Sequence, residues 1–139
     1  PLVLAVSLHA ANDKLRNQLM PINRRYPLTD LLKACQYWID KIGRRITFEY
    51  VLLAGINDNL RDAEELANLL GKLLANVNLI PFNPVAQTNF QKPTKSRVNA
   101  FRRHLESKGI TVTIREEKGG DIAAACGQLR LREMNKNSD

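Results

Sequence analysis

The fold is decided by the apolar stretch at residues 2–10, which reads LVLAVSLHA. Residues 2–8 are apolar apart from Ser7, a pattern typical of a strand that is covered on both faces in a parallel sheet. His9 and Asn12 follow in a polar loop. The chain therefore enters a buried strand almost at once and leaves it through polar residues.

Strands and helices alternate along the rest of the chain. We predict further strands at 45–53, 76–80 and 110–114, and helices at 14–20, from residue 29 or 30 to 42, at 60–74 and at 95–107. Asp13 is expected to cap the first helix, Pro21 to stop it, and Gly43 to end the second. Connections of twenty or more residues between strands indicate right-handed βαβ units. The sequence thus predicts an α/β fold with a parallel sheet, either doubly wound or part of a barrel.

Composition excludes several classes of protein. The chain has 139 residues, of which 44% are hydrophobic, so it can build a packed core and is not disordered throughout. Its longest apolar runs are far too short to cross a bilayer, so we expect no membrane association. The formal charge of +7 favours polyanionic partners such as nucleic acid, although many basic domains bind none.

Cysteine usage indicates the cellular setting. Cys35 and Cys126 are far apart, and the chain has no CxxC motif or Cys/His cluster. Neither a disulfide framework nor a zinc site is therefore expected. A reducing, cytoplasmic location is the default expectation.

Polar residues that could carry chemistry follow the predicted strands, where parallel sheets bind their ligands. His9 could bind a ligand or transfer protons, or be a plain loop histidine. Asn83, between Pro81 and Pro84, could aim its amide at a ligand or simply form the turn. The segments at these strand ends are 7–10, 54–58, 81–84 and 118–126.

The two cysteines are expected to differ. Cys126, behind Gly119 and Gly120, could be an accessible nucleophile or could pack among small neighbours. Cys35 lies on the apolar stripe of a helix and is expected in the core. Glu49, inside a strand, must point outward or meet a polar partner in a barrel interior, and the second alternative is favoured.

Five blocks of sequence occur in one order along the chain. They read AVSLHA at 5–10, MPIN at 20–23, FEYVL at 48–52, NLIPFNP at 78–84 and DIAAACGQL at 121–129. This series resembles the C-terminal half of the RlmN-type radical-SAM RNA methyltransferases, and the match runs from residue 2 to about 130. The SLHA, NLIPFNP and AACGQL blocks are specific in combination, whereas each alone would be weak.

The resemblance implies the C-terminal half of a partial (βα) radical-SAM barrel, a parallel sheet with helices on its outer face. Residues 1–131 would form this part, with a methyl-carrier cysteine loop at about 118–128, and residues 132–139 a disordered tail. In the family, S-adenosylmethionine methylates C2 of an adenine in 23S rRNA and, in some members, in tRNA, with an electron donor protein. Cys126 matches the cysteine that first takes the methyl group. Ser7, Leu8, His9 and Asn83 match positions that contact S-adenosylmethionine.

The family scheme also needs groups that this chain lacks. A second S-adenosylmethionine is split at a [4Fe–4S] cluster, and the resulting radical activates the methylated cysteine, since adenine C2 is electrophilic and has no nucleophile for ordinary methyl transfer. The cluster motif CxxxCxxC and a second, resolving cysteine are absent here. Two cysteines cannot supply three thiolate ligands, so we expect no metal ligands in this chain and no activity from it alone.

Two other functions stay open at this point. The Cfr-type relatives methylate adenine C8 and share much of the series. Alternatively, the basic chain could be a free-standing RNA-binding module without catalysis. Because half a barrel leaves its inner face uncovered, the chain by itself is also expected to self-associate.

Overall fold

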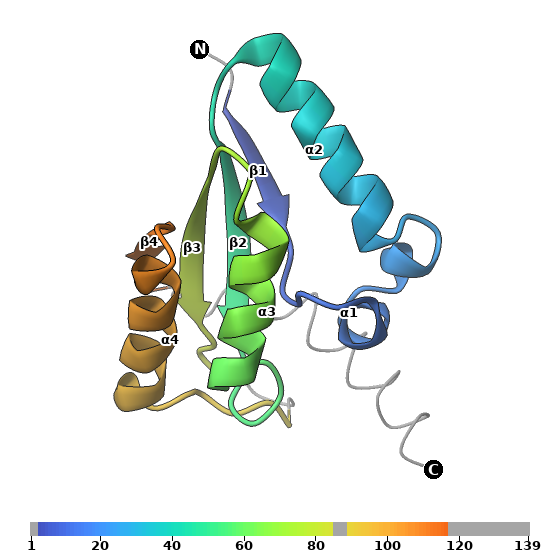
Figure 1. Ribbon diagram of the computed structural model, residues 1–139. Helices are drawn as coiled ribbons and strands as arrows, with labels where there is room; N and C mark the ends of the chain where they lie inside the picture. Colours follow the sequence, from blue (N-terminus) through green and yellow to red (C-terminus); the bar gives the residue numbers. More distant parts are fainter. Residues whose placement is uncertain (1–2, 85–88, 117–139) are drawn as a thin grey trace.

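The fold is built on a four-stranded parallel sheet. A computed structural model describes residues 3–84 and 89–116. Neighbouring strands in the sheet are consecutive in the chain, in the order β1-β2-β3-β4 (Figure 1). The strands are β1 (Leu4–Ser7), β2 (Ile46–Leu52), β3 (Ala75–Pro81) and β4 (Thr111–Ile114). This sequential order is that of a barrel segment and rules out the doubly wound alternative.

Helices cover one face of this sheet, as the sequence predicts (Figure 1). The helical elements are α1 (Asp13–Leu19), the 3-10 helix η1 (Pro21–Arg24), α2 (Leu28–Ile42), α3 (Leu60–Leu70) and α4 (Lys95–Ser107). Phe48 and Tyr50 of β2 point into this helical layer and are fully buried with Leu66 and Phe101. The Tyr50 and Phe101 rings lie 5.3 Å apart between centroids. Large apolar side chains on both layers therefore form one continuous core.

Several predicted boundaries need correction. The cap of α1 is Asn12, whose side chain accepts the Leu15 N–H at 2.8 Å, and not Asp13. The Asp13 carboxylate is used elsewhere, as the acceptor of the Leu28 N–H at 2.9 Å. Helix α2 consequently begins at Leu28, before the predicted Thr29 or Asp30, without a side-chain cap of its own.

The predicted end of α3 is also wrong. The helix stops at Leu70, four residues early, because Leu74 already accepts the Ile46 N–H at 3.1 Å and leads into β3. Gly43 ends α2 as predicted, with a φ of 73° that suits glycine. The bounds of α4 are those predicted.

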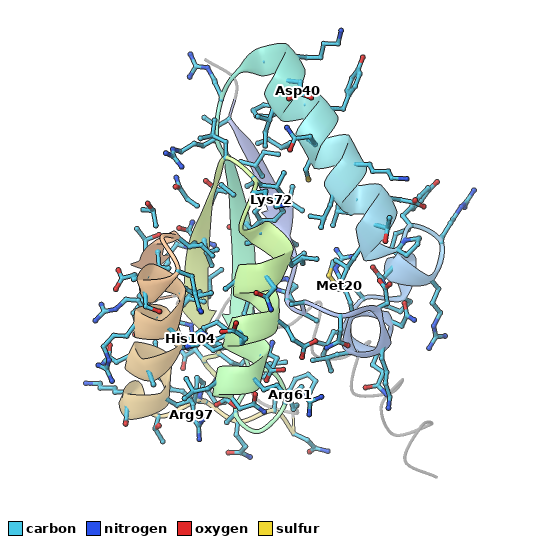
Figure 2. All side chains as sticks on the ribbon, viewed as in Figure 1. Met20, Asp40, Arg61, Lys72, Arg97 and His104 are labelled. Atoms are coloured by element: carbon cyan, nitrogen blue, oxygen red, sulfur yellow. The ribbon has the colours of Figure 1, made fainter. Side chains whose placement is uncertain are left out.

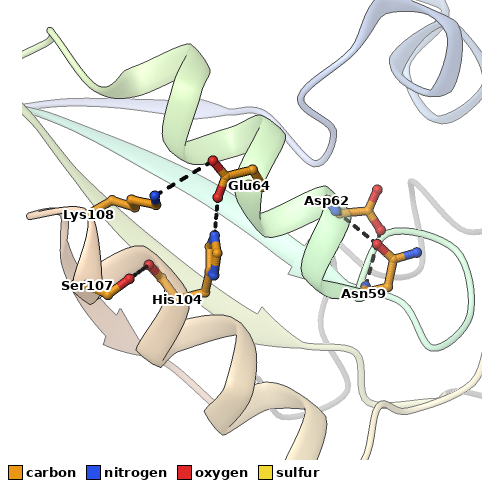
Figure 3. A network of polar contacts seen from close by, with 6 residues as sticks. All are labelled: Asn59, Asp62, Glu64, His104, Ser107 and Lys108. Carbon is orange, nitrogen blue, oxygen red and sulfur yellow. Dashed lines mark hydrogen bonds and ion pairs between the residues drawn. The ribbon is translucent and has the colours of Figure 1, made fainter.

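Polar contacts fasten the outer helices to each other. Glu64 of α3 bonds His104 of α4 and lies 3.8 Å from the Lys108 ammonium (Figure 3). Asn59 and Asp62 form a reciprocal capping box at the start of α3. The Glu64 contacts thus link α3 to α4, and the capping box fixes where α3 begins.

That opposite face carries a row of polar residues. Ser7, Glu49, Asn78 and Thr113 are register partners on the four neighbouring strands. Glu49 lies between Phe48 and Tyr50 and so faces away from the helices, where its carboxylate accepts a bond from Arg115 at 2.9 Å. The prediction of a polar interior partner for Glu49 is confirmed.

The structure also bears on the membrane question. Within the described residues, no helix combines the length and the apolar character needed to cross a membrane.

Candidate functional site

The carboxyl ends of β1, β2 and β3 meet at one edge of the sheet. Leu8 N–H donates to the Glu49 carbonyl at 2.8 Å, and Phe82 N–H donates to the Leu52 carbonyl at 3.0 Å. These bonds extend the parallel pairing just past the strands. The predicted residues Ser7, Leu8 and His9 therefore share an edge with Asn83, and the end of β2 lies between them.

His9 is buried, and its ring is held in a fixed orientation. Its side chain is 4% exposed, and its Nδ1 accepts the Val51 N–H at 3.0 Å. Because Nδ1 is the acceptor, the ring proton of the neutral imidazole lies on Nε2. His9 also has a φ of 61°, a conformation that costs free energy in a residue with a Cβ. A strained backbone and a fixed ring at a strand end are features of functional sites.

Asn57 joins the ends of β1 and β2. It is 0% exposed, and its amide donates to the carbonyls of His9 and Val51, both at 2.8 Å. Its side-chain oxygen accepts the Leu53 N–H at 2.7 Å. Burial raises the pKa of Tyr50 well above its usual value, so the hydroxyl stays protonated and donates to the Asn57 carbonyl at 2.8 Å. The Asn57 side chain thereby provides hydrogen-bond partners for three buried backbone groups.

Arg16 of α1 binds the same segment from the other side. It is 4% exposed, and its Nε and Nη2 donate to the carbonyls of Leu8 and Ser7, both at 2.9 Å. Its Nη1 donates to Asn23 at 2.7 Å, and Asn23 donates to Asp13 at 3.0 Å.

Burial and hydrogen bonding shift two pKa values in this network. Burial lowers the pKa of the Arg16 guanidinium, and the nearby Asp13 carboxylate opposes that shift. The pKa of Asp13 is lowered because its carboxylate accepts hydrogen bonds from the Leu28 backbone and from Asn23. The network therefore keeps a positive and a negative charge behind the end of β1.

A second apolar core cluster lies beside these polar groups. Val51, Leu53, Ile80 and Phe82 alternate with the helix-facing residues and are buried in a cluster of their own. Phe90 packs edge-on to Phe82, with ring centroids 5.9 Å apart. Leu19 of α1 belongs to the same cluster, so this apolar cluster is closed within the described residues.

Other predicted residues have different outcomes. Asn83 lies two residues past the end of β3 and is half-buried. Pro81, which was expected in the turn with Asn83, is instead the last residue of β3. Cys35 is 2% exposed and burial raises the pKa of its thiol, which confirms a core residue and disfavours a nucleophile. Cys126, its loop at 118–128 and the tail at 132–139 lie outside the described residues.

Sequence reasoning missed Arg16 altogether and noted Asn23 only as part of the MPIN block, without a role. An arginine on a short helix ordinarily faces solvent, and only the tertiary structure shows that this one is buried against the Ser7 and Leu8 carbonyls. Asn57 belongs to a segment noted at a strand end, but nothing in its spacing marked it as a hub. Among residues 3–84 and 89–116, no group of three or more His, Cys, Asp or Glu residues could hold a metal ion.

Comparison with known proteins identifies close relatives of this chain. No family model matches it. It is 55% identical, over 99% of its length, to a probable dual-specificity RNA methyltransferase RlmN of Desulforamulus reducens, and 56% identical over 95% to one of Caldicellulosiruptor saccharolyticus. The chain spans 39% and 38% of these two proteins.

Solved structures agree with these relatives. A radical SAM methyltransferase from Sphaerobacter thermophilus superposes on 93% of this chain with a TM-score of 0.84 and 53% identity, and the chain covers 38% of it. A domain of pyruvate-formate lyase-activating enzyme from Bacteroides vulgatus also matches, with a TM-score of 0.65. That match covers 81% of this chain and 66% of the solved domain. At 16% identity, the second match shows a shared fold alone.

Proposed function

The chain belongs to the RlmN-type radical-SAM methyltransferase family, and from this premise we propose that the complete protein methylates C2 of an adenine in 23S rRNA. The observation that carries the proposal is identity above 50% across almost the whole chain to proteins named RNA methyltransferases. tRNA adenine is proposed as a second substrate, in keeping with the dual specificity in the relatives' names.

The edge of the sheet suits S-adenosylmethionine. Ser7, Leu8 and His9 at the end of β1 are proposed to contact it, together with Asn83 just after β3. When bound, S-adenosylmethionine would supply the methyl group. The protein's part is to hold the ligand and exclude water, and the buried polar groups of this edge support that role.

Cys126 is the proposed methyl carrier. Its position in the DIAAACGQL block supports this role, with Sγ accepting the methyl group before adenine does. A [4Fe–4S] cluster does not fit the residues of this chain, since its two cysteines cannot provide three thiolates. Its ligands are therefore proposed to lie elsewhere in the complete protein, and this chain alone to be inactive.

Positive charge near the site supports RNA as the partner. Arg61 at the start of α3 and Arg97 at the start of α4 are exposed and lie at the end of the molecule where the strands end (Figure 2). Together with a formal charge of +7, these residues could contact phosphates around a target adenine. An electron donor protein and a cytoplasmic location complete the proposal, and the isolated chain is expected to self-associate.

The test is to incubate the full-length protein with rRNA and with tRNA and to identify the modified nucleosides by mass spectrometry. We expect 2-methyladenosine, and 8-methyladenosine would show the Cfr-type reaction instead. RNA that binds in a salt-dependent way but stays unmodified would favour the RNA-binding module, which the positive charge also suits.

A pair of cysteine variants tests the methyl carrier. Cys126→Ala should abolish RNA methylation, whereas the matched control Cys35→Ala should keep it at a stability cost of roughly 1 kcal/mol. The peptide that contains Cys126 should carry one extra methyl group in protein purified in its active form. Near-normal turnover by Cys126→Ala, or an unmodified peptide, would contradict the assignment.

A further inference from the structure

Three successive carbonyl oxygens at the end of β1 accept hydrogen bonds from side chains. The Ser7 and Leu8 carbonyls accept from Arg16, and the His9 carbonyl accepts from Asn57, at distances of 2.8–2.9 Å. Both donors are almost fully buried and belong to other elements, α1 and the loop after β2. The path of the chain through 7–9 is therefore fixed from two sides.

A buried arginine contributes little net stability to a fold. Burial of a charge costs free energy, and an apolar side chain of similar volume often stabilises a protein as well or better. A guanidinium offers something else, because its fork can donate in fixed geometry to two neighbouring carbonyls at once. Asn23 accepts a hydrogen bond from the third nitrogen of Arg16 and donates one to Asp13, so the orientation of the guanidinium is fixed.

The conformation of His9 needs such support. Its positive φ is unfavourable for a non-glycine residue and persists only where surrounding contacts hold it. Asn57 bonds the His9 carbonyl, and Val51 N–H bonds its ring. Release of these contacts would let 7–9 relax toward an ordinary extended path.

We propose that Arg16 and Asn57 are positioning residues that hold Ser7–His9 in the conformation that binds the adenosyl cofactor. This inference rests on the proposed function and adds two residues that do not themselves touch the ligand. Their contribution lies in pre-organisation, since a displacement of about 1 Å in a binding segment can cost up to about a hundredfold in rate.

The experiment measures binding of S-adenosylhomocysteine to the full-length protein by isothermal titration calorimetry. Arg16→Lys keeps the charge but loses the fork, and Asn57→Asp keeps the shape but loses the two donated bonds. Each should weaken binding about tenfold or more. The matched controls Arg103→Lys on α4 and Asn68→Asp on α3, both exposed, should stay within about twofold of wild type.

Further measurements separate positioning from a purely structural role. In turnover assays the KM for S-adenosylmethionine should rise in Arg16→Lys more than kcat falls. If a variant fails to fold, Tyr50→Phe gives a milder perturbation, because it removes only the bond to the Asn57 carbonyl. It should weaken binding about two- to threefold.

The possible failures are distinguishable. Variants that lose thermal stability but bind S-adenosylhomocysteine as wild type does would overturn the positioning role. Failure of the wild-type protein to bind S-adenosylhomocysteine would instead count against the proposed function.

Discussion

Replacing Asn57 with alanine is expected to remove a large share of the protein's stability. The side chain makes three buried hydrogen bonds, to the carbonyls of His9 and Val51 at 2.8 Å and from the Leu53 N–H at 2.7 Å. At about 1 to 1.5 kcal/mol each, these three bonds give an expected loss of about 3 to 4.5 kcal/mol. A domain of this size is stable by about 5–15 kcal/mol, so the loss is readily measured.

Urea unfolding followed by circular dichroism provides the assay. Asn68→Ala is the control, because Asn68 is exposed on α3 and its replacement should change stability by less than about 0.7 kcal/mol. A loss below about 1 kcal/mol for Asn57→Ala, with an unchanged dependence on urea concentration, would refute the reasoning. It would mean that water replaces these bonds without cost.

Three further changes test other parts of the structure. Because the pKa of Asp13 is lowered in the folded protein, its contribution to stability is complete above its unfolded pKa of about 3.9 and is lost as pH falls through the folded pKa. Asp13→Asn should therefore flatten the acid side of the stability–pH curve, measured by urea unfolding at each pH. Gly43→Ala should lower the free energy of unfolding by about 1 kcal/mol in the same assay, because a φ of 73° is strained for a residue with a Cβ, even though the added Cβ would have no atom within 4 Å. An unchanged urea midpoint would contradict this. A double-mutant cycle on Glu49 and Arg115 should give a coupling free energy below about 1 kcal/mol, because Arg115 is partly exposed and solvent screens the ion pair. The coupling should weaken as salt is added, and a coupling that does not depend on salt would be inconsistent with a screened ion pair.

Local patterns in the sequence predicted most of the secondary structure. The bounds of α4 and the stop at Gly43 follow from helical spacing and from glycine's tolerance of positive φ. The parallel sheet follows from apolar runs separated by long connections. The wrong cap of α1 shows the limit of such reasoning: Asn12 and Asp13 both suit a cap, and the distant Leu28 N–H determines which of them serves.

The sequence by itself determined that the sheet is parallel and that Ser7, His9 and Asn83 lie at strand ends, because apolar periodicity and the spacing between strands can be read from single segments. The sequential order of the strands, which separates a barrel segment from a doubly wound sheet, is visible only in the tertiary structure. Only the tertiary structure decided how these strand ends are held. The ring of His9 meets Val51 across 42 positions of the chain, and its carbonyl meets Asn57 across 48. Such partners are chosen by the packing of whole elements against each other, because a buried donor or acceptor must find whichever complementary group the fold brings within reach.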